Sequence, residues 1–218
     1  TAVGRGSLSA NTTGEDNVAV GNRALEANTT GDKNTAVGQS LVNNTTGYSN
    51  TAVGYAACDG KTEGNTNTAI GAYALSTAGT ASNNTALGTS ALYLNTDGNS
   101  NVAVGKEALY NATTSSNNTA VGAFAGKATT TGINNTFIGT GAALKNTTGQ
   151  ENTAVGRDSL YENLTGGHNT AVGYQALVEN TAGNHITALG YQALKNNTAS
   201  NGTALGSQAL RLNTTGAN

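Results

Sequence analysis

The chain has 218 residues, of which 10 are Lys or Arg and 12 are Asp or Glu, so its net charge is −2. A surface with so few charges gives no electrostatic basis for binding nucleic acid or an anionic membrane. No apolar run is long enough to span a membrane, and the single cysteine, Cys58, excludes a disulfide framework.

A seventeen-residue period runs through the whole sequence. Ten of the twelve steps are 17 residues long and two are 16. Repetition at a fixed short period predicts one small structural unit stacked many times. We therefore expect residues 1–218 to form a single array of about 13 coils, part of a longer fibre protein. Each copy of the tetrapeptide Thr-Ala-Val-Gly, or of a close variant, ends at Gly4, Gly21, Gly38, Gly54, Gly71, Gly88, Gly105, Gly122, Gly139, Gly156, Gly173, Gly190 or Gly206.

Each repeat begins with the composition of a short strand. With the repeat glycine numbered 0, position −4 is Asn in 10 of 12 copies and −3 is Thr in 11 of 13; −2 is Ala in 12, and −1 is Val, Ile or Leu in all 13. β-branched residues bounded by Asn and Gly are typical of strands. Thr and Val lie on one side of such a strand and Ala on the other. We expect Thr and Val to face the inside, and the small Ala predicts close approach by a second chain or by the opposite wall of a flat coil.

The rest of the repeat contains a second apolar site and then turn residues. Ala and Leu stand at +3 and +4, with Leu at +4 in nine copies, and predict either a second short strand or a tight turn. The short period favours the strand. Asn-Thr-Thr-Gly follows, and these residue types favour turns. All 22 charged residues avoid positions −4 to 0, +3 and +4, as burial of two walls would require.

These features predict an all-β fold, a parallel β-solenoid or β-roll with Val and Leu lining its inside. Identical positions then stack at roughly 4.8 Å, the spacing between strands, which gives a rod on the order of 60 Å long. The Asn residues at −4 and +7 would form columns whose amides hydrogen-bond along the axis. Because such a core is thin, we expect association between several chains or end to end.

Tyrosines recur at two positions and are the candidate surface-binding residues. Rows of exposed aromatic side chains can bind a glycan or a protein receptor, although such residues more often cover a bend. The first group, at +1, is Tyr55, Tyr174 and Tyr191, and the second, at +5, is Tyr93, Tyr110 and Tyr161.

Few other residues suggest chemistry. His168 and His185 share +12 in consecutive coils and should stack, either as a metal-binding or pH-sensitive pair or as part of a solvated turn. Cys58 occupies the Leu position at +4, where we expect burial. The carboxylates form no repeated calcium-binding pattern. We therefore expect no metal, no cofactor and no catalytic site.

Residues 169–177, Asn-Thr-Ala-Val-Gly-Tyr-Gln-Ala-Leu, resemble repeats in the heads of trimeric autotransporter adhesins and in related fibre proteins of phages and bacteria. Residues 65–74 and 152–156 match the same motif, and the resemblance covers nearly the whole chain. In that family the repeat is usually shorter than the 17 residues found here. The resemblance implies a left-handed parallel β-roll, three chains side by side, and attachment outside a cell or on a virion.

The sequence leaves two functions open. The first is a structural and adhesive fibre that assembles as a homotrimer or an end-to-end filament and presents or spaces a surface for a receptor or glycan. The second is ice binding by columns of Thr on a flat face, which requires that face to point outward. An enzyme built on a β-helix needs clustered acids and bases, and the sparse, dispersed charges of this chain disfavour it.

Overall fold

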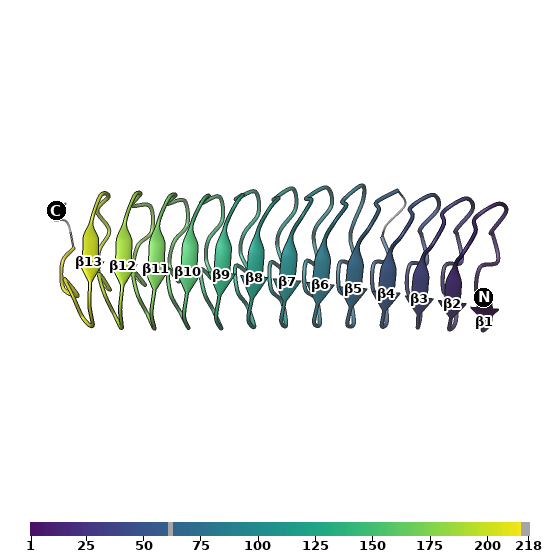
Figure 1. The fold of residues 1–218 in the computed structure, drawn as a ribbon, viewed down its shortest axis with the longest axis horizontal. Helices are drawn as coiled ribbons and strands as arrows, with labels where there is room; N and C mark the ends of the chain where they lie inside the picture. The colour runs from purple at the N-terminus through teal and green to yellow at the C-terminus, as the bar shows by residue number, and fades with distance from the viewer. Residues whose placement is uncertain (61–62, 215–218) are drawn as a thin grey trace.

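The chain winds into an elongated rod, seen in a computed structural model that describes residues 1–60 and 63–214 (Figure 1). Each coil contributes one short strand, and the thirteen strands form a single parallel sheet in chain order. The predicted β-solenoid is therefore confirmed, and the described residues contain no helix. Residues 61–62 and 215–218, which the predicted array also includes, lie outside the described residues.

The strands pair through equivalent residues of successive repeats, such as Ala103 and Ala120. The two shortened repeats keep this register, since Thr35 still pairs with Thr51 sixteen residues later. The missing residue is therefore absorbed in a turn. The strands are β1 (Ala2–Val3), β2 (Val18–Val20), β3 (Thr35–Val37), β4 (Thr51–Val53), β5 (Thr68–Ile70), β6 (Thr85–Leu87), β7 (Val102–Val104), β8 (Thr119–Val121), β9 (Thr136–Ile138), β10 (Thr153–Val155), β11 (Thr170–Val172), β12 (Thr187–Leu189) and β13 (Thr203–Leu205).

Ala, and not Val, points from each strand into the coil. From β2 to β13 the middle residue is buried, whereas the Thr and Val on either side are partly or largely exposed. Ala103 is fully buried, while Val37 is 38% and Leu87 44% exposed. The prediction that Val lines the interior and that Thr faces inward is therefore wrong. The opposite wall of the same coil approaches the strand so closely that a methyl group and the Leu side chains from the turns fill the space.

The Ala-Leu segment forms a turn and not the favoured second strand. Leu109 has a φ of +50° and Glu107 a φ of +55°, both in the left-handed region. The chain therefore curls too tightly for a strand, although the N–H of Leu109 still donates to the carbonyl oxygen of Ala125 at 3.0 Å. A left-handed residue costs roughly 1–2 kcal/mol. Full burial of Leu109 offsets that cost, because burying a Leu side chain contributes about 1.5–3 kcal/mol.

The repeat glycine is required by close approach between coils. Gly105 has a φ of +129°, and a Cβ on it would lie 2.6 Å from the carbonyl oxygen of Gly122 in the next coil. Any side chain at this position would push the two coils apart, because real Cβ atoms do not approach backbone oxygen so closely.

Buried Asn residues stack along the rod in two columns, as predicted for positions −4 and +7. Ile186 interrupts the first column, and Ala78, Ala112 and Thr129 interrupt the second. At −4, the Oδ1 of Asn118 accepts the backbone N–H of Asn135 at 2.9 Å, and its Nδ2 donates to the carbonyl oxygen of Gly132 at 2.9 Å. At +7, the Nδ2 of Asn163 donates to the Oδ1 of Asn146 at 2.8 Å. These amides satisfy backbone groups that such short strands leave without partners.

Phe137 in β9 is the single exception to Ala at −2. Its ring is fully buried, and the space comes from Gly126, which replaces Leu at +4 in the preceding coil. A Cβ on Gly126 would lie 2.6 Å from the Cδ2 of Phe137. The large side chain and the missing one therefore compensate each other within the core.

We expect Phe137→Ala to lower the free energy of unfolding by about 3–5 kcal/mol, because it leaves a cavity. Gly126→Leu should also destabilise, since the new side chain would overlap the Phe137 ring. The double variant restores the composition of the neighbouring repeats, and Gly126 already has the left-handed φ of +57° that Leu adopts at this position. Urea unfolding of the unmodified protein, the two single variants and the double variant measures the coupling free energy between positions 126 and 137. If the double variant loses as much free energy of unfolding as the two single variants together, the two side chains do not compensate each other.

The Asn column at −4 gives a second prediction. Asn118→Ala leaves the N–H of Asn135 and the carbonyl of Gly132 buried without these partners, at about 1–3 kcal/mol for each group. We expect a matching fall in the free energy of unfolding and faster hydrogen exchange at the amide of Asn135. Thr114→Ala, on the exposed surface, is the control. An Asn135 amide that keeps its protection would show that the side-chain column does not hold the coils together.

Candidate functional site

The predicted tyrosines lie on the wall of the rod that the turns form, which we call the turn wall (positions +1 to +6). Tyr55 meets Tyr73 edge-on with ring centroids 5.3 Å apart, and Tyr73 meets Tyr93 at 6.3 Å. Tyr93 then stacks on Tyr110 at 5.1 Å. Tyr55 of the first predicted group and Tyr93 and Tyr110 of the second are thus joined into one row. Tyr73, at +2, makes the connection and was not predicted, although its place between +1 and +5 on the same turn is a signal that could have identified it.

Cations continue this row toward the C-terminus. The Nζ of Lys127 lies 5.7 Å from the ring centroid of Tyr110 and 5.5 Å from that of Phe124. Farther along, the Nζ of Lys145 lies 5.6 Å from the centroid of Tyr161. Such cation–π contacts stabilise both partners. Neither the cations nor Phe124 were among the predicted site residues.

The last two predicted tyrosines form a separate pair. Tyr174 and Tyr191 stack with ring centroids 5.7 Å apart, and the guanidinium of Arg157 lies 5.8 Å from the Tyr174 ring. Stacked rings and cations occupy ring faces along the row. The stacked pairs therefore offer a ligand mainly ring edges and hydroxyl groups, and not the open faces on which a sugar ring usually lies.

Ion pairs fix the charge state of the row. The carboxylate of Glu107 accepts a hydrogen bond from Lys127 at 2.7 Å, which holds the pKa of Glu107 below its usual value. The Nζ of Lys145 donates to Glu162 at 2.7 Å, and this contact raises the pKa of Lys145. Both shifts favour the charged forms of Glu107 and Lys145.

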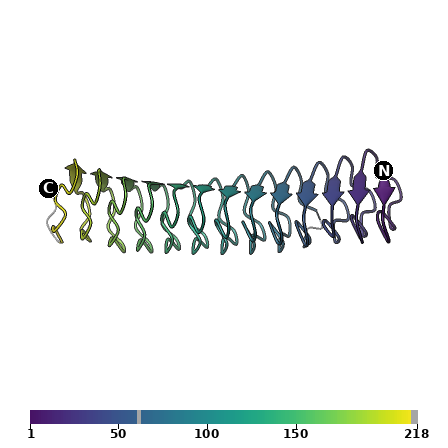
Figure 2. The same cartoon turned by 90° about the horizontal axis from the view of Figure 1, so that it is seen from below.

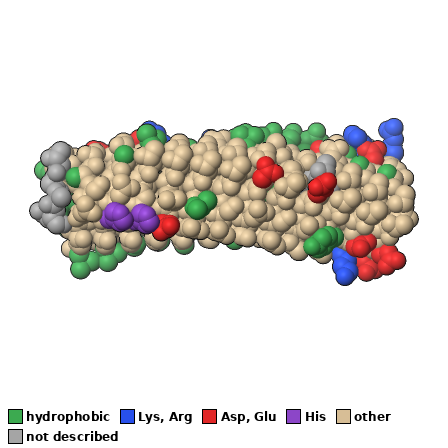
Figure 3. Space-filling model, turned by 90° about the horizontal axis from the view of Figure 1, so that it is seen from above, with side chains coloured by type: hydrophobic (Ala, Val, Ile, Leu, Met, Phe, Trp, Pro, Cys, Tyr) green, Lys and Arg blue, Asp and Glu red, His purple; other side chains and the backbone are tan. Residues whose placement is uncertain are grey.

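The two histidines stack as predicted, with ring centroids 4.8 Å apart and planes inclined by 6°. Figure 3 shows them side by side on the surface of the rod. The Nδ1 of His168 lies 3.0 Å from the Oε2 of Glu151, at +12 in the preceding coil. Over residues 1–60 and 63–214, no three His, Cys, Asp or Glu side chains come close enough together to hold a metal ion. Cys58 is fully buried, as expected for the Leu position.

The outward side of the sheet is a second candidate surface. We call it the Thr/Val face: the residues at −3 and −1 of the thirteen repeats, none of which is charged. Ile138 and Leu189 on this face are each 40% exposed. The sequence pattern attributes the absence of charge at these positions to burial inside the coil. Since they are exposed, burial within this chain does not explain it.

Comparison with models of protein families, with curated proteins and with solved structures found no match. Among the described residues, no helix has the length and apolar character needed to cross a membrane. The candidate functional surfaces of the rod are therefore the turn wall and the Thr/Val face.

Proposed function

We propose that the chain is a segment of an extracellular fibre, in which copies of the rod pack against one another through the Thr/Val face. The observation that carries this proposal is the uncharged outward side of the sheet. A sheet with one solvated side normally carries polar and charged residues on that side. Here position −1 is Val, Ile or Leu in all thirteen copies, and many of these side chains are exposed.

The extent of this face supports a large contact with another protein surface. Val20, Val37 and Ile70, from β2, β3 and β5, are each 38% exposed and belong to one apolar column along the sheet. Long contiguous apolar patches on soluble proteins mark interaction sites. A second copy of the chain offers the same column at the same spacing, so equivalent rods match along their whole length.

The shape of the face favours other rods over a flat partner. Figure 2 shows the strands turning progressively about the long axis of the rod from β1 to β13. Rods with the same twist can wrap around one another and keep their faces in contact, as twisted sheets and helices do. A homotrimer, as in the resembling adhesin heads, is the arrangement that we propose. End-to-end stacking of the terminal strands is the alternative.

The function of such an assembly is mechanical and adhesive. Charged side chains on the described part of the rod are dispersed and often paired, as Lys127 is with Glu107. We therefore infer that the chain acts by spacing and presenting a surface, and not by catalysis. The turn wall, with its tyrosines and cations, stays outward in such an assembly and would meet a cell-surface receptor or glycan.

The mass of the purified chain in solution tests the assembly. We expect light scattering after size exclusion to give three times the chain mass of 21.6 kDa. Val121→Lys combined with Val155→Lys places two ammonium groups in the centre of the Thr/Val face, and should yield folded monomers because an unpaired charge in an apolar interface is strongly destabilising.

Thr114→Lys combined with Thr148→Lys is the matched control, since both residues are exposed and lie away from that face. This variant should keep the mass of the unmodified protein. A folded monomer for the unmodified chain would overturn the proposed packing, and a mass that grows with concentration would favour end-to-end stacking.

Ice binding is a second candidate, because the Thr column points outward and not inward. Regularly spaced hydroxyl and methyl groups on an uncharged sheet can order water. The twist seen in Figure 2 opposes this function, since an ice plane is flat.

Thermal hysteresis at high protein concentration decides whether the rod binds ice. An ice-binding rod lowers the freezing point below the melting point, and Thr119→Leu together with Thr153→Leu should reduce that gap. Freezing that is indistinguishable from that of buffer would remove this candidate.

A further inference from the structure

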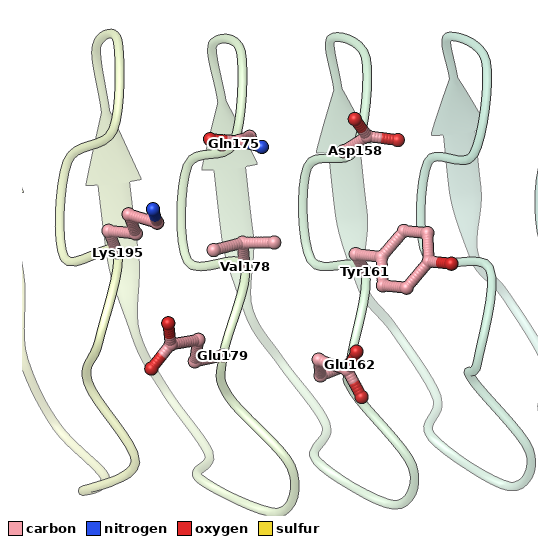
Figure 4. A pocket seen from close by; sticks show the side chains of 7 residues that line it. All are labelled: Asp158, Tyr161, Glu162, Gln175, Val178, Glu179 and Lys195. Atoms are coloured by element: carbon pink, nitrogen blue, oxygen red, sulfur yellow. The ribbon is translucent and has the colours of Figure 1, made fainter.

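A hollow opens on the turn wall where a row of bulky side chains at +5 is interrupted. Tyr161 and Lys195 stand at +5 in two coils, and the smaller Val178 stands at +5 in the coil between them. The hollow has a volume of about 390 Å³. Figure 4 shows its side chains in front of the strands, on the turn wall, so packing through the Thr/Val face would leave it accessible. It is lined by Asp158, Tyr161, Glu162, Gln175, Val178, Glu179 and Lys195.

Two of the three carboxylates in the hollow are already neutralised. Asp158 lies 3.2 Å from the Nε of Arg157, and Glu162 lies 2.7 Å from the Nζ of Lys145. These pairs join neighbouring residues or adjacent coils, so they are part of the wall itself. Paired carboxylates keep acceptor capacity for further hydrogen bonds without adding net charge.

The third carboxylate, that of Glu179, shares the hollow with the ammonium group of Lys195. Figure 4 shows both side chains rising from neighbouring coils beside Val178. The charges around the hollow therefore balance, three negative against three positive. A balanced site attracts neither a polyanion nor a polycation at long range.

The polar groups suit a ligand with many hydroxyl groups. The Oε1 of Gln175 accepts from the Nε2 of Gln192 at 2.9 Å, which leaves the NH₂ group of Gln175 as a donor in a lining that also contains the acceptors of Glu179. Hydroxyl groups both donate and accept, so they can use carboxylates, an amide and an ammonium group together. The methyl groups of Val178 add an apolar patch, as small-molecule sites usually have beside a few polar groups.

One rim of the hollow is held in place. A Cβ on Gly141 would lie 3.6 Å from the Tyr161 ring, so the ring packs directly over the backbone of the preceding coil. Figure 4 shows the ring directed away from Val178, toward that coil. The space over Val178 is therefore not filled by its aromatic neighbour.

We propose that the hollow over Val178 binds a sugar residue of a neutral glycan. The inference rests on the proposed attachment function, and it names the class of ligand for the turn wall. Neutral sugars offer hydroxyl groups for the polar lining and C–H groups for Val178. Sialylated or sulfated glycans carry an anion that these balanced charges do not attract, so we expect no preference for them over neutral glycans.

Filling the hollow is the direct test. Val178→Tyr introduces a side chain that Tyr93 and Tyr110 already place at +5, so the coil can accommodate it. Thr114→Tyr adds the same side chain at an exposed position that lies off the turn wall, and is the matched control. The probe is an immobilised array of neutral oligosaccharides, with sialylated, sulfated and amine-bearing glycans for comparison.

We expect the unmodified chain and Thr114→Tyr to bind a subset of the neutral glycans. Val178→Tyr should lose at least tenfold in affinity for those glycans. Glu179→Gln keeps the shape of the hollow but replaces a charged acceptor, and should weaken binding about tenfold, the difference between a charge-assisted and a neutral hydrogen bond. Circular dichroism of each variant establishes that the fold is retained.

Three results would overturn the proposal: no glycan bound by the folded chain, binding of charged glycans alone, or equal binding by Val178→Tyr. The mass measurement separates this inference from the proposed function. An assembled protein that binds no glycan leaves the fibre standing and removes the glycan site. A monomer that binds neutral glycans would keep the glycan site and remove the proposed fibre packing.

Discussion

Hydrogen bonds between neighbouring coils hold this rod together, because no strand is longer than three residues and none could persist alone. The backbone supplies one set of bonds in the sheet and another in the turns, where the N–H of Leu109 reaches the carbonyl of Ala125. The buried Asn side chains add a third set. The backbone sets can form with any residue type, but the side-chain set continues only where the next coil has Asn at the same place. The repeat glycine must also recur, because neighbouring coils approach so closely at that position.

The period and the Asn columns could be predicted because they depend only on stacking of equal positions. The sequence could not predict which face of each strand is turned toward the interior of the coil. Alternation separates Ala from Thr and Val, but the distance to the opposite wall decides which side is inward. That distance is set by left-handed residues at +2 and +4, where Leu and Glu give no sign of a positive φ. The available hints were Gly6 and Gly141 at +2 and Gly126 at +4.

On the candidate surfaces, too, contacts between equal positions could be predicted and contacts that depend on the path of the turns could not. Shared positions predicted that Tyr174 would meet Tyr191, and it does. The joining role of Tyr73 depends on the curvature of the turn, which brings +2 of one coil beside +1 and +5 of its neighbours. The hollow exists because the side chain of Val178 is smaller than those of Tyr161 and Lys195, which stand at the same position in the two neighbouring coils. A motif search finds what is present and overlooks a gap of this kind.

The axial direction of the hydrogen bonds has a mechanical consequence. Tension applied at the two ends of the rod acts along these bonds and loads the terminal coil first, so that coils should peel away one at a time. Each released coil adds slack of 16 or 17 residues before the next is loaded. Because the coils contact only their neighbours, the remainder stays folded. A tether with this architecture lengthens in small steps under load and can rewind when the load falls.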